Sequence, residues 1–173
     1  MSLETANLVL DPCVPSHIIA LIETPDRFEE MTGMPAAAGL REMYASDDVS
    51  PEWLATLRAS AVADPWQHGF FIIHRDVRVV IGSAGFKGPP DASGIVEIAY
   101  GIAPGFQGQG YATEAARALI EFAQRSPRVL LIRAHTLPGA NASTRVLPKC
   151  GFTRIGTIID PADGPVWRWE RLP

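Results

Sequence analysis

The chain has 173 residues, of which 47% are hydrophobic and 20% are charged, and its formal net charge is -4 at pH 7. This length and composition predict one globular domain over residues 1–173 with a sizeable apolar core, and they exclude a disordered or fibrous chain. The negative net charge argues against a nucleic-acid binder with a broad basic face, and it is compatible with small cationic substrates.

The cysteines and the apolar runs indicate the compartment in which the protein works. Cys13 and Cys150 lie far apart and belong to no ligand cluster, which predicts two free thiols in a reducing compartment and no metal site. No apolar run approaches the length of a membrane span, and the N-terminus lacks a basic segment followed by an apolar one. We therefore expect a cytoplasmic protein without membrane contact, either a monomer or a homodimer.

The N-terminal third is expected to combine a short strand with helices. The strand and the two clearest helices are predicted at residues 7–12, 15–23 and 50–63. Ser50 is the expected N-cap of the last helix, with Pro51 at its first helical position. Residues 31–48 give mixed signals, typical of an irregular surface segment or of an adaptable pocket wall, and the pair Asp47 and Asp48 is typical of a solvated turn.

From His68 onward, apolar and β-branched runs predict strands. The first two runs flank a polar turn and predict a hairpin, and the third is largely apolar on both faces, which predicts a central strand. These three runs are GFFIIHR, VRVVIGSAGFKG and GIVEIAYGI, at residues 69–75, 77–88 and 94–102.

A long helix over residues 112–124 follows, because its apolar residues recur at the spacing of one helical stripe. With the strand at 128–135 it forms a crossover unit whose two strands run parallel. A short helix within residues 141–152, in which Pro148 is awkward, and two closing strands complete the chain. This order predicts a mixed, mostly antiparallel α/β sheet with helices on both faces.

The loop QGQGYAT, residues 107–113, places a glycine-rich turn between a strand and a helix. Such a turn leaves several backbone N–H groups in one concavity at the positive end of the helix, which predicts a phosphate site. The plain alternative is a tight connection whose glycines only satisfy backbone geometry. A Walker loop needs a lysine that is missing here, and a dinucleotide fingerprint fails at Thr113 and lacks the later acidic residue.

The segment QGQGYA also fits the signature Q/R-x-x-G-x-G/A, with Gln107, Gly110 and Ala112 at the defining positions. Together with VVIGSAGF before it and HTLPGANASTRVLPKCGF after it, this segment resembles the GNAT superfamily of acetyl-CoA-dependent N-acetyltransferases. The resemblance is to the branch typified by ribosomal-protein N-terminal acetyltransferases, closely over residues 68–152 and in outline before them. It implies acetyl transfer from acetyl-CoA to a primary amine, either a protein N-terminus or a small molecule, by direct attack in a ternary complex.

The resemblance further implies where the chain holds acetyl-CoA. The pantetheine arm is expected to pair with the end of the central strand at Ile102, and a backbone N–H at a bulge in that strand is expected to polarise the acetyl carbonyl. Asn141 is expected at the cofactor arm, although the family's usual asparagine falls on Ala140. The loop residues assigned to the pyrophosphate are Gln107, Gly108, Gln109, Gly110, Tyr111, Ala112 and Thr113.

Two residues are expected to assist the chemistry. Glu97 is the ionisable carboxylate of the central strand, and its apolar neighbours are expected to raise its pKa and make it a base for the amine, directly or through water. The alternative is a glutamate on a solvated patch of sheet. Ser143 matches a serine of the family and is expected to donate to the CoA sulfur, or to cap the helix that follows. Tyr100 and Tyr111 are alternative acids.

Two other classes of function stay open. One is a CoA-binding module without catalysis that acts as a sensor or partner, and the other is a nucleotide-binding protein that uses the glycine loop. The acceptor amine is not readable from the sequence. Residues of the N-terminal helices and the closing hairpin that are expected near it, or in the core, are Met31, Met34, Met43, Tyr44, Trp66, Trp167 and Trp169.

Overall fold

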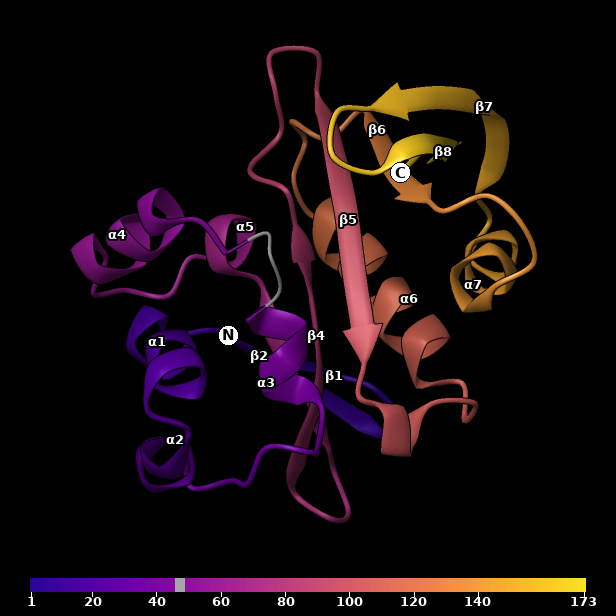
Figure 1. Ribbon diagram of the computed structural model, residues 1–173. Coiled ribbons are helices and arrows are strands. Elements are labelled where there is room, and N and C mark those ends of the chain that lie inside the picture. The colour runs from indigo at the N-terminus through magenta and orange to yellow at the C-terminus, as the bar shows by residue number, and fades with distance from the viewer. Residues whose placement is uncertain (46–48) are drawn as a thin grey trace.

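An eight-stranded sheet forms the centre of the protein in the computed structural model, which describes residues 1–45 and 49–173 (Figure 1). The strand order is β1-β2-β3-β4-β5-β6-β8-β7, and all neighbours are antiparallel except β5 and β6, which are parallel. The predicted mixed, mostly antiparallel sheet is therefore confirmed. The pair Asp47 and Asp48 lies outside the described residues.

The bounds of the elements follow the predicted order closely from residue 69 onward. The strands are β1 (Leu3–Glu4), β2 (Leu8–Pro12), β3 (Phe70–His74), β4 (Val79–Phe86), β5 (Ile95–Ile102), β6 (Leu131–Thr136), β7 (Thr153–Asp160) and β8 (Gly164–Arg171). The helices are α1 (Pro15–Glu23), α2 (Pro25–Thr32), α3 (Leu40–Tyr44), α4 (Pro51–Ala59), α5 (Pro65–His68), α6 (Tyr111–Gln124) and α7 (Ala142–Lys149), with a 3-10 turn at Pro104–Phe106. Over residues 1–45 and 49–173, none of the helices has both the length and the apolar character needed to cross a membrane.

The N-terminal helices are partly as predicted. Ser50 caps α4 by accepting the backbone N–H of Trp53 at 3.1 Å, but the helix ends at Ala59 rather than at residue 63. The irregular segment expected over residues 31–48 contains the short helix α3. Tertiary contacts explain this difference, because Leu40 is fully buried and α3 therefore packs into the core.

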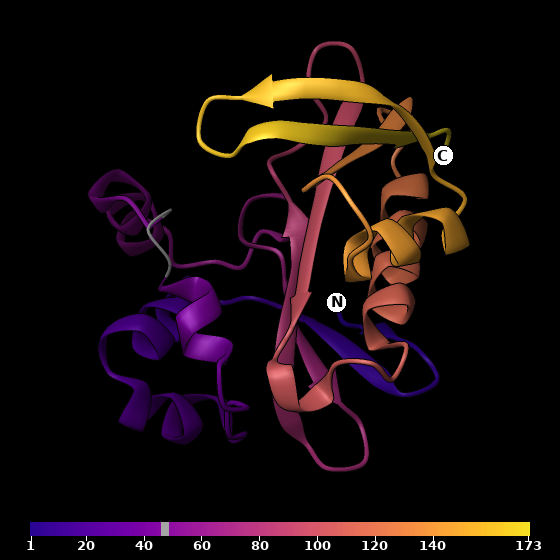
Figure 2. The ribbon, with the colours of Figure 1, turned by 45° about the vertical axis from the view of Figure 1, so that its right-hand side comes forward.

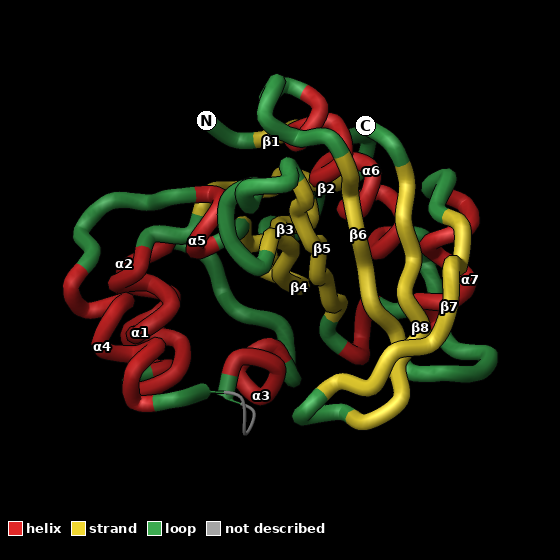
Figure 3. The backbone as a smooth tube through the Cα atoms, turned by 90° about the horizontal axis from the view of Figure 1, so that it is seen from above, coloured by secondary structure: helices red, strands yellow, loops and turns green. Residues whose placement is uncertain are grey.

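The helices cover the sheet in two layers. Helices α6 and α7 lie on one face, and α1 to α4 lie on the other (Figures 2 and 3). A separate apolar cluster fills the space under each layer, the larger one beneath α6 and α7. Both cysteines are free, as predicted, and both are buried.

The crossover unit β5–α6–β6 creates the feature that matters most for function. Strands β5 and β6 pair only over three positions, from Ile95 with Leu131 to Glu97 with Arg133. Beyond this point β5 continues to Ile102 and β6 to Thr136 without further pairing between them. The sheet therefore opens between two adjacent parallel strands, and side chains have to fill or line that opening.

Candidate active site

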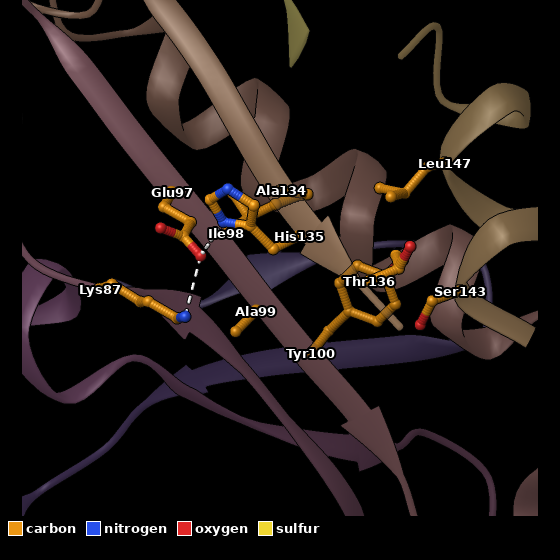
Figure 4. A pocket seen from close by; sticks show the side chains of 10 residues that line it. All are labelled: Lys87, Glu97, Ile98, Ala99, Tyr100, Ala134, His135, Thr136, Ser143 and Leu147. Carbon is orange, nitrogen blue, oxygen red and sulfur yellow. Dashed lines mark hydrogen bonds and ion pairs between the residues drawn. The ribbon is translucent and has the colours of Figure 1, made fainter. Parts of the chain in front are cut away.

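A pocket of about 120 Å³ lies where β5 and β6 separate. Because the opening passes through the sheet, side chains from both faces line it. Figure 4 shows Lys87, Glu97 and His135 toward one end, and Tyr100 and Ser143 toward the other. The complete lining is Lys87, Glu97, Ile98, Ala99, Tyr100, Ala134, His135, Thr136, Ser143 and Leu147.

The backbone of β5 presents free peptide groups to this opening. Lys87 N–H donates to the Glu97 carbonyl at 2.9 Å, and Ala103 N–H donates to the Ile81 carbonyl at 2.7 Å, so the odd-numbered residues of β5 face β4. Since peptide groups alternate along a strand, Tyr100 and its even-numbered neighbours turn theirs toward the opening. An extended ligand arm can pair there as an additional strand would.

The bulge that the resemblance implies in this strand is not seen. The β4–β5 pairs advance one residue at a time, from Phe86 with Ile98 to Gly82 with Ile102. The backbone groups on the other edge of β5 are free because β6 diverges, and no extra residue is needed to expose them. Separation of the two strands thus exposes these backbone groups without a bulge.

Glu97 is held by two partners at the mouth of the pocket. Its Oε1 atom lies 2.9 Å from Lys87 Nζ and 2.8 Å from His135 Nδ1. His135 stands near the end of β6, on the same face of the sheet as Glu97. The carboxylate is therefore part of a bonded cluster and is not a glutamate on a solvated patch of sheet.

The predicted rise in the pKa of Glu97 is wrong. Burial does raise this pKa, but the hydrogen bonds from His135 and Lys87 and the charge of Lys87 outweigh burial, so the pKa lies below its ordinary value of 4.5. The two partners lie in other parts of the chain, Lys87 directly after β4 and His135 in β6, so the apolar neighbours of Glu97 within its own strand did not indicate them. Glu97 is consequently ionised at neutral pH.

Arg168 fixes the tautomer of His135. Its Nε–H donates to His135 Nε2 at 3.0 Å, and an arginine side chain has no acceptor. Nε2 must therefore accept, which places the proton on Nδ1, where it is donated to the Glu97 carboxylate. Arg168 thus donates to His135, and His135 donates to Glu97, which is a directed series of hydrogen bonds. Lys87 donates to the same carboxylate oxygen from the other side of the series.

This assignment predicts a specific nitrogen spectrum. In long-range ¹H–¹⁵N correlation spectra at neutral pH, His135 is expected to show the Nδ1–H tautomer, the less common form in solution. Arg168→Met is expected to free Nε2 but to keep the Nδ1–H tautomer, because the ionised Glu97 carboxylate still accepts from Nδ1. A predominant Nε2–H tautomer in the wild type would contradict the directed series, and His17, distant in sequence and outside this cluster, gives an internal reference.

Ser143 and Tyr100 meet at the other end of the pocket. Ser143 lies in the first turn of α7 but is not its N-cap, so that expectation is wrong. The Tyr100 hydroxyl is buried and makes no hydrogen bond of ordinary geometry with any described residue. Burial raises its pKa to about 12, and the neighbouring Ser143 hydroxyl opposes this rise. The Tyr100 and Ser143 hydroxyls therefore stand together at this end of the pocket.

Asn141 serves as the N-cap of α7. Its side-chain oxygen accepts the Thr144 N–H at 3.0 Å, and the Thr144 hydroxyl accepts the Asn141 N–H at 2.9 Å, which completes a capping box. Its amide nitrogen donates to the Leu137 carbonyl at 3.0 Å. The expected contact with a cofactor arm stays a prediction, and it would require these bonds to be exchanged. Pro148 lies inside α7, one residue before this short helix ends at Lys149.

The glycine loop has the geometry of an anion site. Gly108 and Gly110 adopt φ angles of 74° and 85°, and a Cβ atom on either would meet open space. Gly110 is the N-cap of α6, and no side chain caps the helix there. The first-turn N–H groups of α6 thus face outward at the positive end of the helix dipole, and a phosphate can approach them closely.

Side chains around the loop fix its position. The Gln107 amide donates to the Ile102 carbonyl at 2.9 Å, which ties the loop to the end of β5. The Tyr111 hydroxyl bonds to His74 Nε2 at 2.8 Å. Glu114, the acidic residue of the first turn, turns away from the helix end, because its carboxylate accepts the backbone N–H of Asn7 at 2.7 Å. The loop is therefore braced while its amide groups stay free.

The residues expected near the acceptor divide between the core and the open face of β5. Trp66 packs against Phe86 and Phe122, and Trp169 is buried, so both belong to the core. Met43 covers Gly101 so closely that a Cβ on this glycine would lie 2.5 Å from its methyl group. Trp167 is half-buried beneath the Arg154 guanidinium, 4.0 Å from the ring centre.

Three residues of the polar cluster were missed, namely Lys87, His135 and Arg168. Each belongs to a segment that was predicted as a strand, but strand pairing and register decide which side chains meet. The only sequence signal was the alternation along each strand, which places His135 and Arg133 on one face.

Comparison with known protein families identifies the class to which this fold belongs. A family model described as an acetyltransferase (GNAT) domain matches residues 7–153. The chain therefore belongs to the GNAT acetyltransferase family, as the resemblance predicted.

Named relatives agree with this membership. The uncharacterized N-acetyltransferases YjdG of Bacillus subtilis and p20 of Bacillus licheniformis are 33% and 31% identical over 89 and 91 residues. These matches cover 51% and 53% of this chain and 51% of each relative, so they span about half the length of these proteins.

Solved structures share the fold over nearly the whole chain. RimL, a ribosomal L7/L12 alpha-N-protein acetyltransferase in complex with coenzyme A, superposes with a TM-score of 0.68 at 17% identity, covering 99% of this chain and 98% of that one. The aminoglycoside acetyltransferase AAC(6')-Ib in complex with coenzyme A gives 0.64 at 23% identity, with 95% and 94% covered. At such identities the likeness establishes the fold alone.

Proposed function

We propose that this protein transfers an acetyl group from acetyl-CoA to a primary amine by direct attack. The observation that carries this proposal is the conjunction of an uncapped, glycine-rich helix start with an opening between two parallel strands. The first suits a pyrophosphate and the second an extended arm that ends in a thioester. Membership of the GNAT family supports acetyl-CoA as the donor.

The loop and the strand edge would bind different parts of acetyl-CoA. The N–H groups from Gly108 to Thr113 would hold the pyrophosphate, and the free edge of β5 between Ile98 and Ile102 would pair with the pantetheine arm. The Ile102 carbonyl already accepts from Gln107, so its N–H is the group left for this arm. A backbone N–H in this stretch would then polarise the acetyl carbonyl.

Glu97 would receive the acceptor amine. Both of its described partners bond to Oε1, and no described residue bonds to Oε2, so Oε2 is available to an ammonium group or a water. An ionised carboxylate attracts the protonated amine and takes one proton from it before the nitrogen attacks, because the attack needs the nitrogen lone pair. The lowered pKa makes Glu97 a weaker base than expected and a better anchor for a cation.

Calorimetry combined with an acceptor screen tests this function. Acetyl-CoA is titrated into the protein, and thiol release is followed with peptides, polyamines, amino acids and aminoglycosides. We expect saturable acetyl-CoA binding and turnover on at least one class of amine. Binding without turnover on any amine would favour the non-catalytic CoA-binding module, whereas binding of ATP or NAD in place of acetyl-CoA would favour the nucleotide-binding alternative.

A further inference from the structure

We propose that the Tyr100 hydroxyl donates a hydrogen bond to the sulfur of CoA and stabilises the thiolate as it leaves. This inference rests on the proposed function, and it adds a residue that the polar cluster around Glu97 does not include. The observation behind it is a buried hydroxyl without a hydrogen-bond partner among the described residues. Within the described residues, Tyr100 carries the buried side-chain oxygen that lacks a hydrogen-bond partner.

A buried hydroxyl without a partner is unfavourable, because it has lost water and gained nothing in return. Phenylalanine would fill the same space without this cost. Tyr100 lines the pocket at the β5–β6 opening, and the apolar side chain of Leu147 lines the same pocket (Figure 4). The hydroxyl therefore stands at the wall of the opening beside Ser143, without a hydrogen bond of ordinary geometry to any described residue, and a ligand atom can supply an acceptor.

The position of Tyr100 suits the sulfur rather than the acetyl oxygen or the amine. Its side chain lies on the α7 side of β5, whereas Glu97 lies on the other side, where the amine would arrive. A thioester in the opening would present its carbonyl carbon to the amine on one side and its sulfur on the opposite side. Ser143, the residue expected at the sulfur, adjoins Tyr100 and so supports the same placement.

Tyr100 acts as a hydrogen-bond donor and not as an acid. Its pKa is raised to about 12, whereas an ordinary thiol has a pKa of about 8.5, so the phenol keeps its proton in the presence of a thiolate. As the amine nitrogen bonds to the carbonyl carbon, the carbon–sulfur bond breaks and its electron pair goes to sulfur. The amine proton leaves through Glu97 or water, and the thiolate takes a proton from solvent after release.

The test compares CoA with desulfo-CoA, in which hydrogen replaces the thiol, as ligands of the wild type and of Tyr100→Phe. In the wild type, the affinity ratio of CoA to desulfo-CoA is expected to rise with pH as the thiol ionises. In Tyr100→Phe this rise is expected to shrink by about 10- to 100-fold, the range for a hydrogen bond to a charged group. Tyr44→Phe is the matched control, because its hydroxyl already contacts Cys13 Sγ at 3.9 Å.

The possible results separate this inference from the proposed function. Binding of both ligands with an unchanged ratio in Tyr100→Phe would overturn the role of Tyr100 alone, and failure of the wild type to bind either ligand would overturn both proposals. A second measurement uses only the wild type. Thiolate absorbance of bound CoA is expected to titrate at a lower pH than that of free CoA, and titration at the same pH would count against the hydrogen bond. Thermal stability of Tyr100→Phe is expected to equal or exceed that of the wild type.

Discussion

Gly110→Val is expected to abolish measurable acetyl-CoA binding while the protein stays folded. A Cβ at this position would point into open space beside the first-turn amides of α6, where we place the pyrophosphate. Valine branches at this atom, so it would block the close approach of phosphate to backbone. Calorimetry with acetyl-CoA measures the loss, and circular dichroism and thermal melting check the fold.

Gly33→Val is the matched control for this experiment. Gly33 ends α2 with a φ of 71°, close to the 85° of Gly110, and a Cβ there also meets open space. Both substitutions force a branched residue into the left-handed region, at a cost of about 1–3 kcal/mol. Similar losses of stability with a loss of binding only in Gly110→Val would support the pyrophosphate site. Wild-type affinity in a folded Gly110→Val protein would reject it.

Glu97→Gln is expected to lower kcat by about 10²-fold, the lower end of the range for a general base, and to leave acetyl-CoA affinity nearly constant. The lower end is expected because the partners of Glu97 keep its pKa below 4.5 and so limit its basicity. The loss is expected to shrink as pH rises, because the solution then supplies more neutral amine. Steady-state rates across pH measure this effect.

Glu170→Gln supplies the control for Glu97→Gln. Glu170 pairs with Arg133 at 2.7 Å on the adjoining strands, and its side chain is 18% exposed against 21% for Glu97, but it does not line the pocket. Loss of an ion pair in the sheet should therefore have a similar structural cost in both variants. If Glu170→Gln lowered kcat as much as Glu97→Gln, the effect would be structural, and a wild-type kcat in Glu97→Gln would remove Glu97 from the mechanism.

Acid stability gives an independent measurement of the Glu97 cluster. A carboxylate with a lowered pKa in the folded state adds stability that is complete above its unfolded pKa near 4.5 and is lost as pH falls through the folded value. Glu97→Gln is therefore expected to be less stable than the wild type at neutral pH, and this difference is expected to narrow below pH 4.5. Denaturant unfolding at several pH values measures the difference.

The sequence alone determined the elements whose signals are local. The strand β5, the glycine loop and the helix α6 could be predicted because apolar periodicity and glycine chemistry depend on neighbours within a few residues. Their order then restricted the topology to a crossover with two parallel strands. The same local signals placed the candidate anion site at Gly108 and Gly110, and in the structure both glycines have positive φ angles, which glycine adopts readily.

Only the tertiary structure decided how the chemical groups meet. Glu97, His135 and Arg168 come from three strands and Lys87 directly follows a fourth, and a shift of one residue in any pairing would turn a side chain to the opposite face. The pKa of Glu97 is therefore lowered, whereas its own strand predicted that it would be raised. The opening between β5 and β6, and the unpaired hydroxyl of Tyr100 within it, likewise depend on where long-range pairing stops, and neighbours in the sequence do not specify that point.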